Sequence, residues 1–233
     1  MTALPLGTID AATLTWADLR FSLIGCSALL MEATTPFDTR LQHRILALAE
    51  QVRDWDEVAE PVPGVGNLML VFANPRMVDP ARLCDRIARL WPDIAPAPPS
   101  GRVIEVPVIY GGPMASDLAA VCAHTGFGPE ELARRHAAPD YIVATIASAP
   151  GFGYLIGMDP QIATPRKKVP SLNMPKGAVT IGGAQSGISV SKGPNGWNAI
   201  GHTDLITFDP HAARPVTLCP GDVVRFRIEE IRP

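Results

Sequence analysis

Charged and aromatic residues are scarce in this sequence of 233 residues. Charged side chains make up 18% of it and aromatic ones 6%, and the formal net charge is only −3. Because 47% of the residues are apolar, the chain can bury enough surface to fold, so intrinsic disorder is excluded. The small negative net charge gives no reason to expect nucleic acid as a partner.

Cysteine and histidine are also few and widely spaced. No two cysteines form a C-x-x-C pair, which argues against a zinc finger and against a small disulfide framework. The five histidines contain no H-x-x-x-H or H-E-x-x-H pattern, so we expect no metal site. Reduced and mostly buried thiols are expected at Cys26, Cys84, Cys122 and Cys219.

Long apolar runs are absent as well. No stretch approaches the roughly 18 apolar residues that a membrane-spanning helix needs. The segment from Met1 to Asp10 lacks a basic region followed by an apolar run, so it does not resemble a signal peptide. We therefore expect a soluble, cytoplasmic protein with no membrane partner.

Proline and glycine, in contrast, are abundant, with 24 and 20 copies. Of these, 18 prolines and 16 glycines lie at or beyond Pro92, and four prolines fall within residues 92–101. Such a composition boundary predicts two domains, at residues 1–92 and 102–233, joined by a stiff Pro-rich linker at residues 93–101.

The first domain alternates strand and helix patterns. Strands are expected within residues 21–32, 56–60 and 68–72, with a turn at Pro61 to Gly64. Asp38 and Asp79 stand before apolar stripes of helical spacing and are expected to cap two helices. These patterns predict a small α+β domain.

The second domain is predicted to be mainly β. Two short helices are expected, at residues 117–124 and 129–136. Many short segments with strand character are separated by Gly/Pro turns, which favours a closed barrel or a sandwich. The expected strands are residues 103–110, 140–147, 178–181, 188–191, 197–200, 205–208 and 223–228.

The charge distribution of the second domain is uneven. Between Tyr141 and Thr203 the single acidic residue is Asp159, whereas this segment holds Arg166 and all four lysines of the chain. A cationic segment among glycine loops suits an anionic ligand. A solvated loop that keeps a Pro-rich segment soluble is the alternative interpretation.

A glycine-rich segment, Gly182 to Gly187, follows one of the expected strands. It matches neither G-x-x-x-x-G-K-[ST] nor G-x-G-x-x-G, so it is a weak candidate for a phosphate-binding loop. Its glycines are equally consistent with positive φ angles at a barrel corner.

Many residues of the second domain carry a family resemblance. The motifs are Tyr110-Gly111-Gly112, Asp117-Leu118, His136, Pro150-Gly151-Phe152, Tyr154-Leu155, Thr164-Pro165-Arg166, Ile181 to Gln185, Gly187-Ile188, Gly196-Trp197, Ile200-Gly201, Thr203, Phe208-Asp209-Pro210 and Pro220-Gly221-Asp222. Together they resemble subunit 1 of the allophanate hydrolase family, also described as the B subunit of ATP-dependent 5-oxoprolinase. The resemblance covers residues 102–230 closely and the first domain more loosely.

The resemblance implies a cyclophilin-like β-barrel after the α+β domain. It implies a subunit of an ATP-dependent complex that opens the amide of 5-oxoproline to glutamate, with ATP used by the complex. The implied partners are a subunit 2 with a related barrel, a third 5-oxoprolinase subunit and a small anionic substrate. The alternatives within the family are an inhibitor of a sensor histidine kinase and half of a carboxyltransferase of the urea carboxylase type.

The sequence departs from the usual family motifs at several polar positions. Gly153 replaces a proline, Ser171 and His202 replace arginines, and Ser189 replaces a tyrosine. Because serine and histidine lack the bidentate fork of arginine, these changes favour a diverged paralogue with an altered substrate or reduced activity.

No catalytic residue can be assigned, because the dispersed histidines do not form the order of Ser, His and Asp residues that a known catalytic triad has. Asp117 is expected to act as a helix cap and Trp197 to fill the barrel. The residues that we expect to bind the substrate or another anion are Gln185, Tyr154, Arg166, Lys176, His202, Gly182 and Gly183.

Overall fold

The computed structural model describes residues 13–16, 18–96 and 101–232. The chain divides into two compact units, residues 1–98 and 99–233. Residues 97–100 of the expected linker lie outside the described residues. Ahead of them, Trp91–Asp93 forms a 3-10 helix and Ile94 is buried in the core of the first unit.

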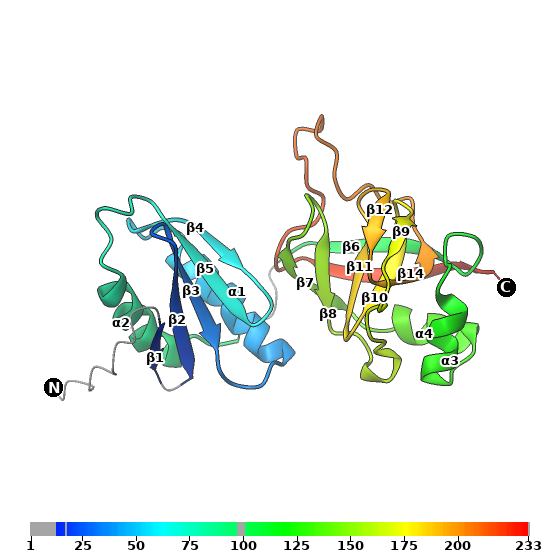
Figure 1. Ribbon diagram of the computed structural model, residues 1–233, viewed down its shortest axis with the longest axis horizontal. Coiled ribbons are helices and arrows are strands. Elements are labelled where there is room, and N and C mark those ends of the chain that lie inside the picture. The colour runs from blue at the N-terminus through cyan, green and yellow to red at the C-terminus, as the bar shows by residue number, and fades with distance from the viewer. Residues whose placement is uncertain (1–12, 17, 97–100, 233) are drawn as a thin grey trace. The chain divides into compact units, whose positions relative to one another are not determined.

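The first unit is one antiparallel sheet with two helices (Figure 1). Helix α1 packs against β4 and β5, and α2 packs against β2. Asp38 and Asp79 cap the helices as expected, since each side chain accepts a backbone N–H of the first turn. The sheet order is β1-β2-β3-β5-β4, with β1 Thr13–Trp16, β2 Leu19–Ile24, β3 Ala28–Ala33, β4 Val58–Pro63 and β5 Asn67–Phe72, and the helices are α1 Thr39–Val52 and α2 Pro80–Leu90.

A turn was expected at Pro61 to Gly64, and this prediction was wrong for residues 61–63. Pro61 and Pro63 belong to strand β4 and pair with Leu70 and Leu68 of β5. Proline cannot donate to a sheet ladder, but β4 lies at the edge of the sheet, where no second neighbour needs its N–H.

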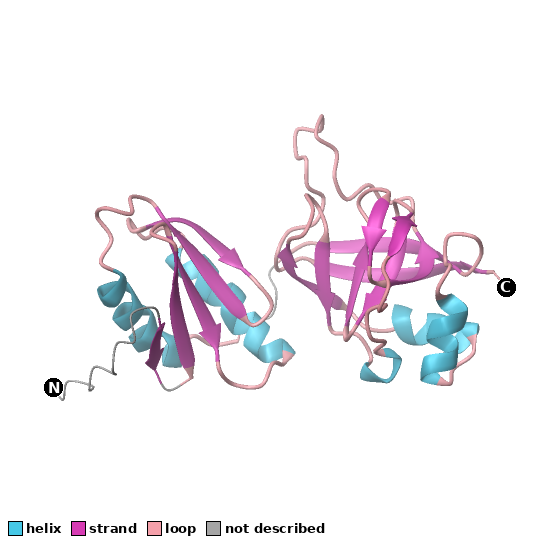
Figure 2. Ribbon diagram, in the orientation of Figure 1, coloured by secondary structure: helices cyan, strands magenta, loops and turns pink. Residues whose placement is uncertain are grey.

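The second unit is a closed seven-stranded barrel, as the sequence predicted (Figure 2). Its order is β10-β11-β8-β7-β14-β6-β13, and β14 pairs with β6 in parallel while the other pairs are antiparallel. The strands are β6 Val103–Tyr110, β7 Tyr141–Ile146, β8 Gly153–Ile156, β10 Ala178–Gly182, β11 Gln185–Ile188, β13 Asn198–His202 and β14 Val223–Ile231.

Smaller elements complete the barrel. Helices α3 (Leu118–Thr125) and α4 (Pro129–Ala137) contribute Leu118 and Leu132 to its core. A two-stranded sheet of β9 (Ser171–Met174) and β12 (Gly193–Asn195) stands apart from the barrel ladder. A short 3-10 helix, Pro160–Ile162, follows β8.

Two strand expectations of the second unit were wrong. The strand expected at residues 188–191 is β11, which starts at Gln185, because Gly183 and Ala184 alone make the turn of the β10–β11 hairpin. Residues 205–208 form no strand and contribute one isolated bridge, between Phe208 and Val216.

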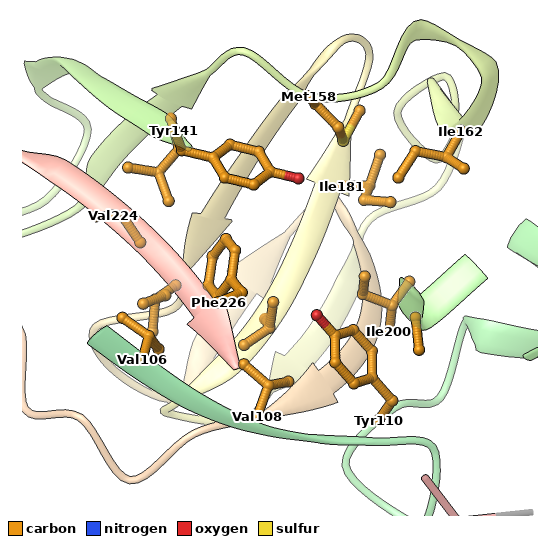
Figure 3. Packing of buried hydrophobic residues seen from close by; sticks show 14 of the residues in the cluster. Val106, Val108, Tyr110, Tyr141, Met158, Ile162, Ile181, Ile200, Val224 and Phe226 are labelled. Carbon is orange, nitrogen blue, oxygen red and sulfur yellow. The ribbon is translucent and has the colours of Figure 1, made fainter. Parts of the chain in front are cut away.

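The barrel interior is apolar but holds two tyrosine hydroxyl groups (Figure 3). The rings of Tyr110, Tyr141 and Phe226 point inward from β6, β7 and β14. All three side chains are almost completely buried. A buried hydroxyl needs a hydrogen-bond partner, and both tyrosines find one at His136 of α4.

Candidate functional site

A cavity of about 380 Å³ opens on the second unit beside the β9–β12 sheet. Its walls come from four segments: the β7–β8 turn with β8, Arg166, Met174 of β9, and the stretch from Ser189 to Trp197. Each segment belongs to the part of the sequence in which acidic residues are rare, and no Asp or Glu is among the described residues that line the cavity.

Three aromatic rings form one wall of the cavity. Phe152, Tyr154 and Trp197 meet pairwise edge to face, with ring centroids 5.2, 5.4 and 5.6 Å apart. Such T-shaped contacts are the favoured geometry between aromatic rings, so the three hold one another in place. Trp197 was expected to fill the barrel, but it lines this cavity instead.

Two glycines allow these rings to lie directly on the β10–β11 hairpin. A Cβ atom added at Gly182 would stand 2.4 Å from Cδ2 of Trp197, and one at Gly187 would stand 2.8 Å from Cζ of Phe152. Gly183, in the turn, has a φ of +66° and no atom near its missing Cβ. The glycine-rich segment therefore supports the aromatic wall, and within it positive φ occurs only at Gly183.

The cavity carries unpaired positive charge. The guanidinium of Arg166 stacks over the ring of Trp197, 5.3 Å from its centroid, as a cation–π contact. Lys192 lines the opposite stretch. Neither side chain takes part in any ion pair within the described part of the chain, whereas most arginines outside this region do. Both cations are therefore available to an anionic ligand.

Hydroxyl groups lie beside these cations. Ser148, in the β7–β8 turn, has a φ of 66° and is the one non-glycine residue with positive φ among the described residues. Its Oγ hydrogen-bonds the hydroxyl of Tyr154. Ser189 and Ser191 line the same cavity. The site thus offers cationic donors, hydroxyl donors and aromatic faces together.

Of the seven residues expected to bind a ligand, Tyr154 and Arg166 line the cavity, and Gly182 supports its wall. Gly183 and Gln185 lie in or beside the hairpin turn and are not lining residues. Lys176 is exposed outside the cavity lining. His202 lies on β13, 3.8 Å from a carboxylate oxygen of Asp204 and next to Gly177.

Asp117 stands at the N-cap position of α3, as expected, but its side chain has another role. Its side chain makes no cap hydrogen bond and instead accepts from Nζ of Lys167 at 2.7 Å and from the Ala199 amide at 2.8 Å. The ammonium of Lys167 also donates to Oγ of Ser171 at 2.6 Å. Because both charged side chains are less than one-fifth exposed, this pair fixes the loop before β9 to the barrel.

A buried chain of hydrogen bonds runs behind the site. Oγ of Ser186 donates to the Thr180 carbonyl and so accepts from Nε2 of His136 at 2.8 Å. Nδ1 of His136 then accepts from the hydroxyl of Tyr110 at 2.7 Å. Complete burial lowers the pKa of His136 to about 3, so the imidazole is neutral at physiological pH.

Four lining residues were not among the predicted ligand-binding residues: Ser148, Phe152, Lys192 and Asn195. Lys192 was detectable because it lies in the cationic segment. No sequence pattern could identify Ser148 as a lining residue, since its position depends on the fold of the turn. Asn195 acts through its side chain, which accepts from the Trp197 amide and donates to Ser189.

The described ranges offer neither a metal centre nor a membrane span. No group of three or more His, Cys, Asp or Glu side chains is arranged to hold a metal ion there. None of the helices in those ranges is long and apolar enough to cross a membrane.

Comparisons with known proteins agree with this architecture. A protein of Escherichia coli O157:H7 that is named as the B subunit of 5-oxoprolinase is 39% identical over 207 residues, which is 89% of this chain and 94% of that protein. The crystal structure of TTHA0988 matches with a TM-score of 0.73 and 32% identity, over 88% of this chain but 40% of that chain. The urea amidolyase of K. lactis shares the fold at 17% identity and a TM-score of 0.73, over 94% of this chain and 16% of that one.

The family comparison covers both units. Residues 19–218 match the model described as carboxyltransferase domain, subdomain C and D. The match runs from β2 of the first sheet to the loop before β14, so it includes every segment that lines the cavity. The chain therefore belongs to the family of the carboxyltransferase domain, subdomains C and D.

Proposed function

We propose that this chain is a subunit of a complex that hydrolyses the cyclic amide of 5-oxoproline with ATP, and that its cavity binds the anionic substrate or an anionic intermediate derived from it. The name of the E. coli relative supports the reaction. The observation that carries the binding role is the cavity itself, in which Arg166 and Lys192 are unpaired and no described lining residue is acidic.

Each part of the lining suits such a ligand. The guanidinium of Arg166 would hold a carboxylate or phosphate through charge-assisted hydrogen bonds, with Lys192 as a second cation. The aromatic wall would pack against the small ring of a lactam. The hydroxyl groups of Ser148 and Tyr154 share one hydrogen bond, so the hydrogen of one is left to donate to a polar atom of the ligand, and both oxygens can accept.

The same lining supports a role for partner subunits in the reaction. It contains no His, Asp, Glu or Cys among its described residues, so no imidazole, carboxylate or thiolate is present there to activate water, and Lys192 and Tyr154 are proposed to bind the ligand. We propose that subunit 2, with a related barrel, and the third 5-oxoprolinase subunit supply the base and the ATP site. No phosphate loop is assigned to this chain, because Gly182 to Gly187 forms a hairpin.

The fold of both units fits this function. The barrel is proposed to be cyclophilin-like, and the α+β first domain, residues 1–92, to be joined to it by the linker at residues 93–101. At one departure from the family motifs, Ser171 takes the place of an arginine and contacts the ammonium of Lys167. Since Lys167 is neutralised by Asp117, this position adds no cation for substrate, which supports a diverged paralogue.

The test is ATP hydrolysis that depends on 5-oxoproline, measured with the chain co-expressed with subunit 2 and the third subunit. Arg166→Gln and Lys192→Gln are each expected to raise the KM for 5-oxoproline roughly tenfold or more, the effect of losing a charge-assisted hydrogen bond of about 1.5–3 kcal/mol. Arg76→Gln is the matched control, because Arg76 is an exposed arginine of the first unit that forms no ion pair within the described residues.

Other outcomes would change the assignment. Turnover of urea or allophanate in place of 5-oxoproline would favour a carboxyltransferase or allophanate hydrolase role. Tight binding to a sensor histidine kinase without any turnover would favour the regulatory alternative. Turnover equal to that of the E. coli relative's complex would contradict the diverged paralogue.

A further inference from the structure

Two of the three most exposed large apolar side chains that the structure describes lie on the segment that leads into and begins the β9–β12 sheet. Among the large apolar residues that the structure describes, Val169, Met77 and Leu172 are the most exposed, at 81, 80 and 75%, and the next reaches 51%. Val169 and Leu172 lie three positions apart, at the start of the β9–β12 sheet. We define residues 166–176 and 190–196, which contain this sheet, as the β9–β12 arm (Figure 1).

The arm carries a strong positive charge around these apolar residues. It contains five basic residues and no acidic one. Lys167 is neutralised by Asp117, but the other four form no ion pair within the described ranges. These unpaired bases are Arg166, Lys168, Lys176 and Lys192.

Hydrogen bonds at both of its segments anchor the arm to the barrel. The Lys167 amide donates to the Gly196 carbonyl at 2.7 Å, while its ammonium holds Asp117 and Ser171. Opposite them, the Asn195 side chain bonds Ser189 and the Trp197 amide. A fixed surface of exposed apolar side chains loses little conformational entropy when a partner covers it.

We propose that the β9–β12 arm is the surface on which subunit 2 docks, with an apolar centre on subunit 2 facing Val169 and Leu172 and carboxylates facing the unpaired bases. This proposal rests on the proposed function, which requires subunit 2. The unpaired bases favour a partner with acidic side chains at the contact, and the exposed apolar side chains favour a protein partner with an apolar surface. The match to TTHA0988 adds that a similar chain is joined to a further 60% of polypeptide in one molecule.

Docking there would also complete the cavity. Met174, Lys192 and Asn195 belong to the arm and line the cavity, so a subunit on the arm would cover its opening. Coverage would exclude water and bring side chains of subunit 2 to the ligand. The arm would thus place the missing general base where Arg166 and Lys192 hold the substrate.

The experiment measures the affinity of purified subunit 2 for the purified full-length chain by isothermal titration calorimetry, at low and high salt. The double variant Val169→Asp/Leu172→Asp is expected to weaken binding at least 100-fold, and Lys168→Glu at least tenfold with a smaller salt dependence. Met77→Asp is the matched control, because Met77 is equally exposed but lies on the first unit, and it is expected to bind as the wild type does.

The outcomes separate the two proposals. Wild-type affinity in both arm variants would overturn the docking surface and leave the proposed function standing. A wild-type chain without affinity for subunit 2 would overturn both. If the wild type sediments as a dimer and the double variant as a monomer with unchanged affinity for subunit 2, a second copy occupies the arm and the proposal is wrong. Since the substituted side chains are exposed, unchanged urea midpoints are expected and serve as the folding control.

Discussion

Replacing Gly182 by alanine tests whether the hairpin backbone supports the aromatic wall. The new Cβ would stand 2.4, 2.6 and 2.7 Å from three ring carbons of Trp197, well inside the ordinary contact distance of about 3.5–4.0 Å. Trp197 is only 5% exposed and is held between Phe152 and Tyr154, so its ring cannot shift without breaking those contacts.

The expected cost follows from this geometry. Overpacking in a well-packed site costs roughly 1–3 kcal/mol. Separating Trp197 from either of its aromatic neighbours adds roughly 0.5–1.5 kcal/mol. The free energy of unfolding should therefore fall by about 2–4 kcal/mol. The affinity for 5-oxoproline should fall at least tenfold, because a displaced Trp197 ring no longer holds the guanidinium of Arg166 by their cation–π contact.

Gly183→Ala is the matched control for this prediction. Nothing lies within 4 Å of its added Cβ, but its φ of +66° makes alanine strained by roughly 1–2 kcal/mol. Urea unfolding should show both variants destabilised, whereas calorimetric titration with 5-oxoproline should show a loss for Gly182→Ala alone. Equal affinity in the two variants, or wild-type stability in Gly182→Ala, would refute the reasoning.

Three further predictions concern the framework of the barrel. The pKa of His136 is about 3 in the folded state and near 6.5 in the unfolded state, so only the unfolded state binds a proton between these pH values. The free energy of unfolding should therefore be highest above about pH 6.5 and fall by about 1.4 kcal/mol per pH unit as the pH drops toward 3. Urea titrations of His136→Gln should lack this slope. Asp222→Ala should cost roughly 2–4 kcal/mol by chemical denaturation, since this buried carboxylate accepts from Arg102 and from the Cys219 amide, and Asp222→Asn should cost less. Asp117→Asn should leave the ammonium of Lys167 without its counter-charge and lower the melting temperature by several degrees. Adding Lys167→Met should not increase this effect, because it removes the uncompensated charge.

The elements that local sequence determines were predicted well. Asp38 and Asp79 precede periodic apolar stripes, and both cap helices as expected, because a cap depends only on its own turn. Short strands between Gly/Pro turns favoured a barrel or a sandwich, and the family resemblance implied the barrel that the structure has. Pro61 and Pro63 were misplaced because their position at a sheet edge depends on strand order, which a local pattern does not contain.

The site was predicted only in part for the same reason. The cationic segment pointed to Arg166, but charge alone could not separate Lys192, which lines the cavity, from Lys176, which does not. Asp117 looked like a cap because it precedes a helix, yet its partner Lys167 lies 50 positions away. Ser148 joins Tyr154 only through the conformation of one turn. The roles of these residues depend on contacts between segments that are distant in the sequence, and a local sequence pattern cannot predict such contacts.

The placement of all four lysines on or beside one small sheet has a practical consequence. Amine-reactive reagents modify lysine but not arginine, and every other basic side chain of the chain is arginine or histidine. Apart from the α-amino group, such reagents would therefore label the β9–β12 arm and nothing else. A lysine-directed cross-linker would report on this surface alone, and a chain immobilised through its lysines would turn its cavity toward the support.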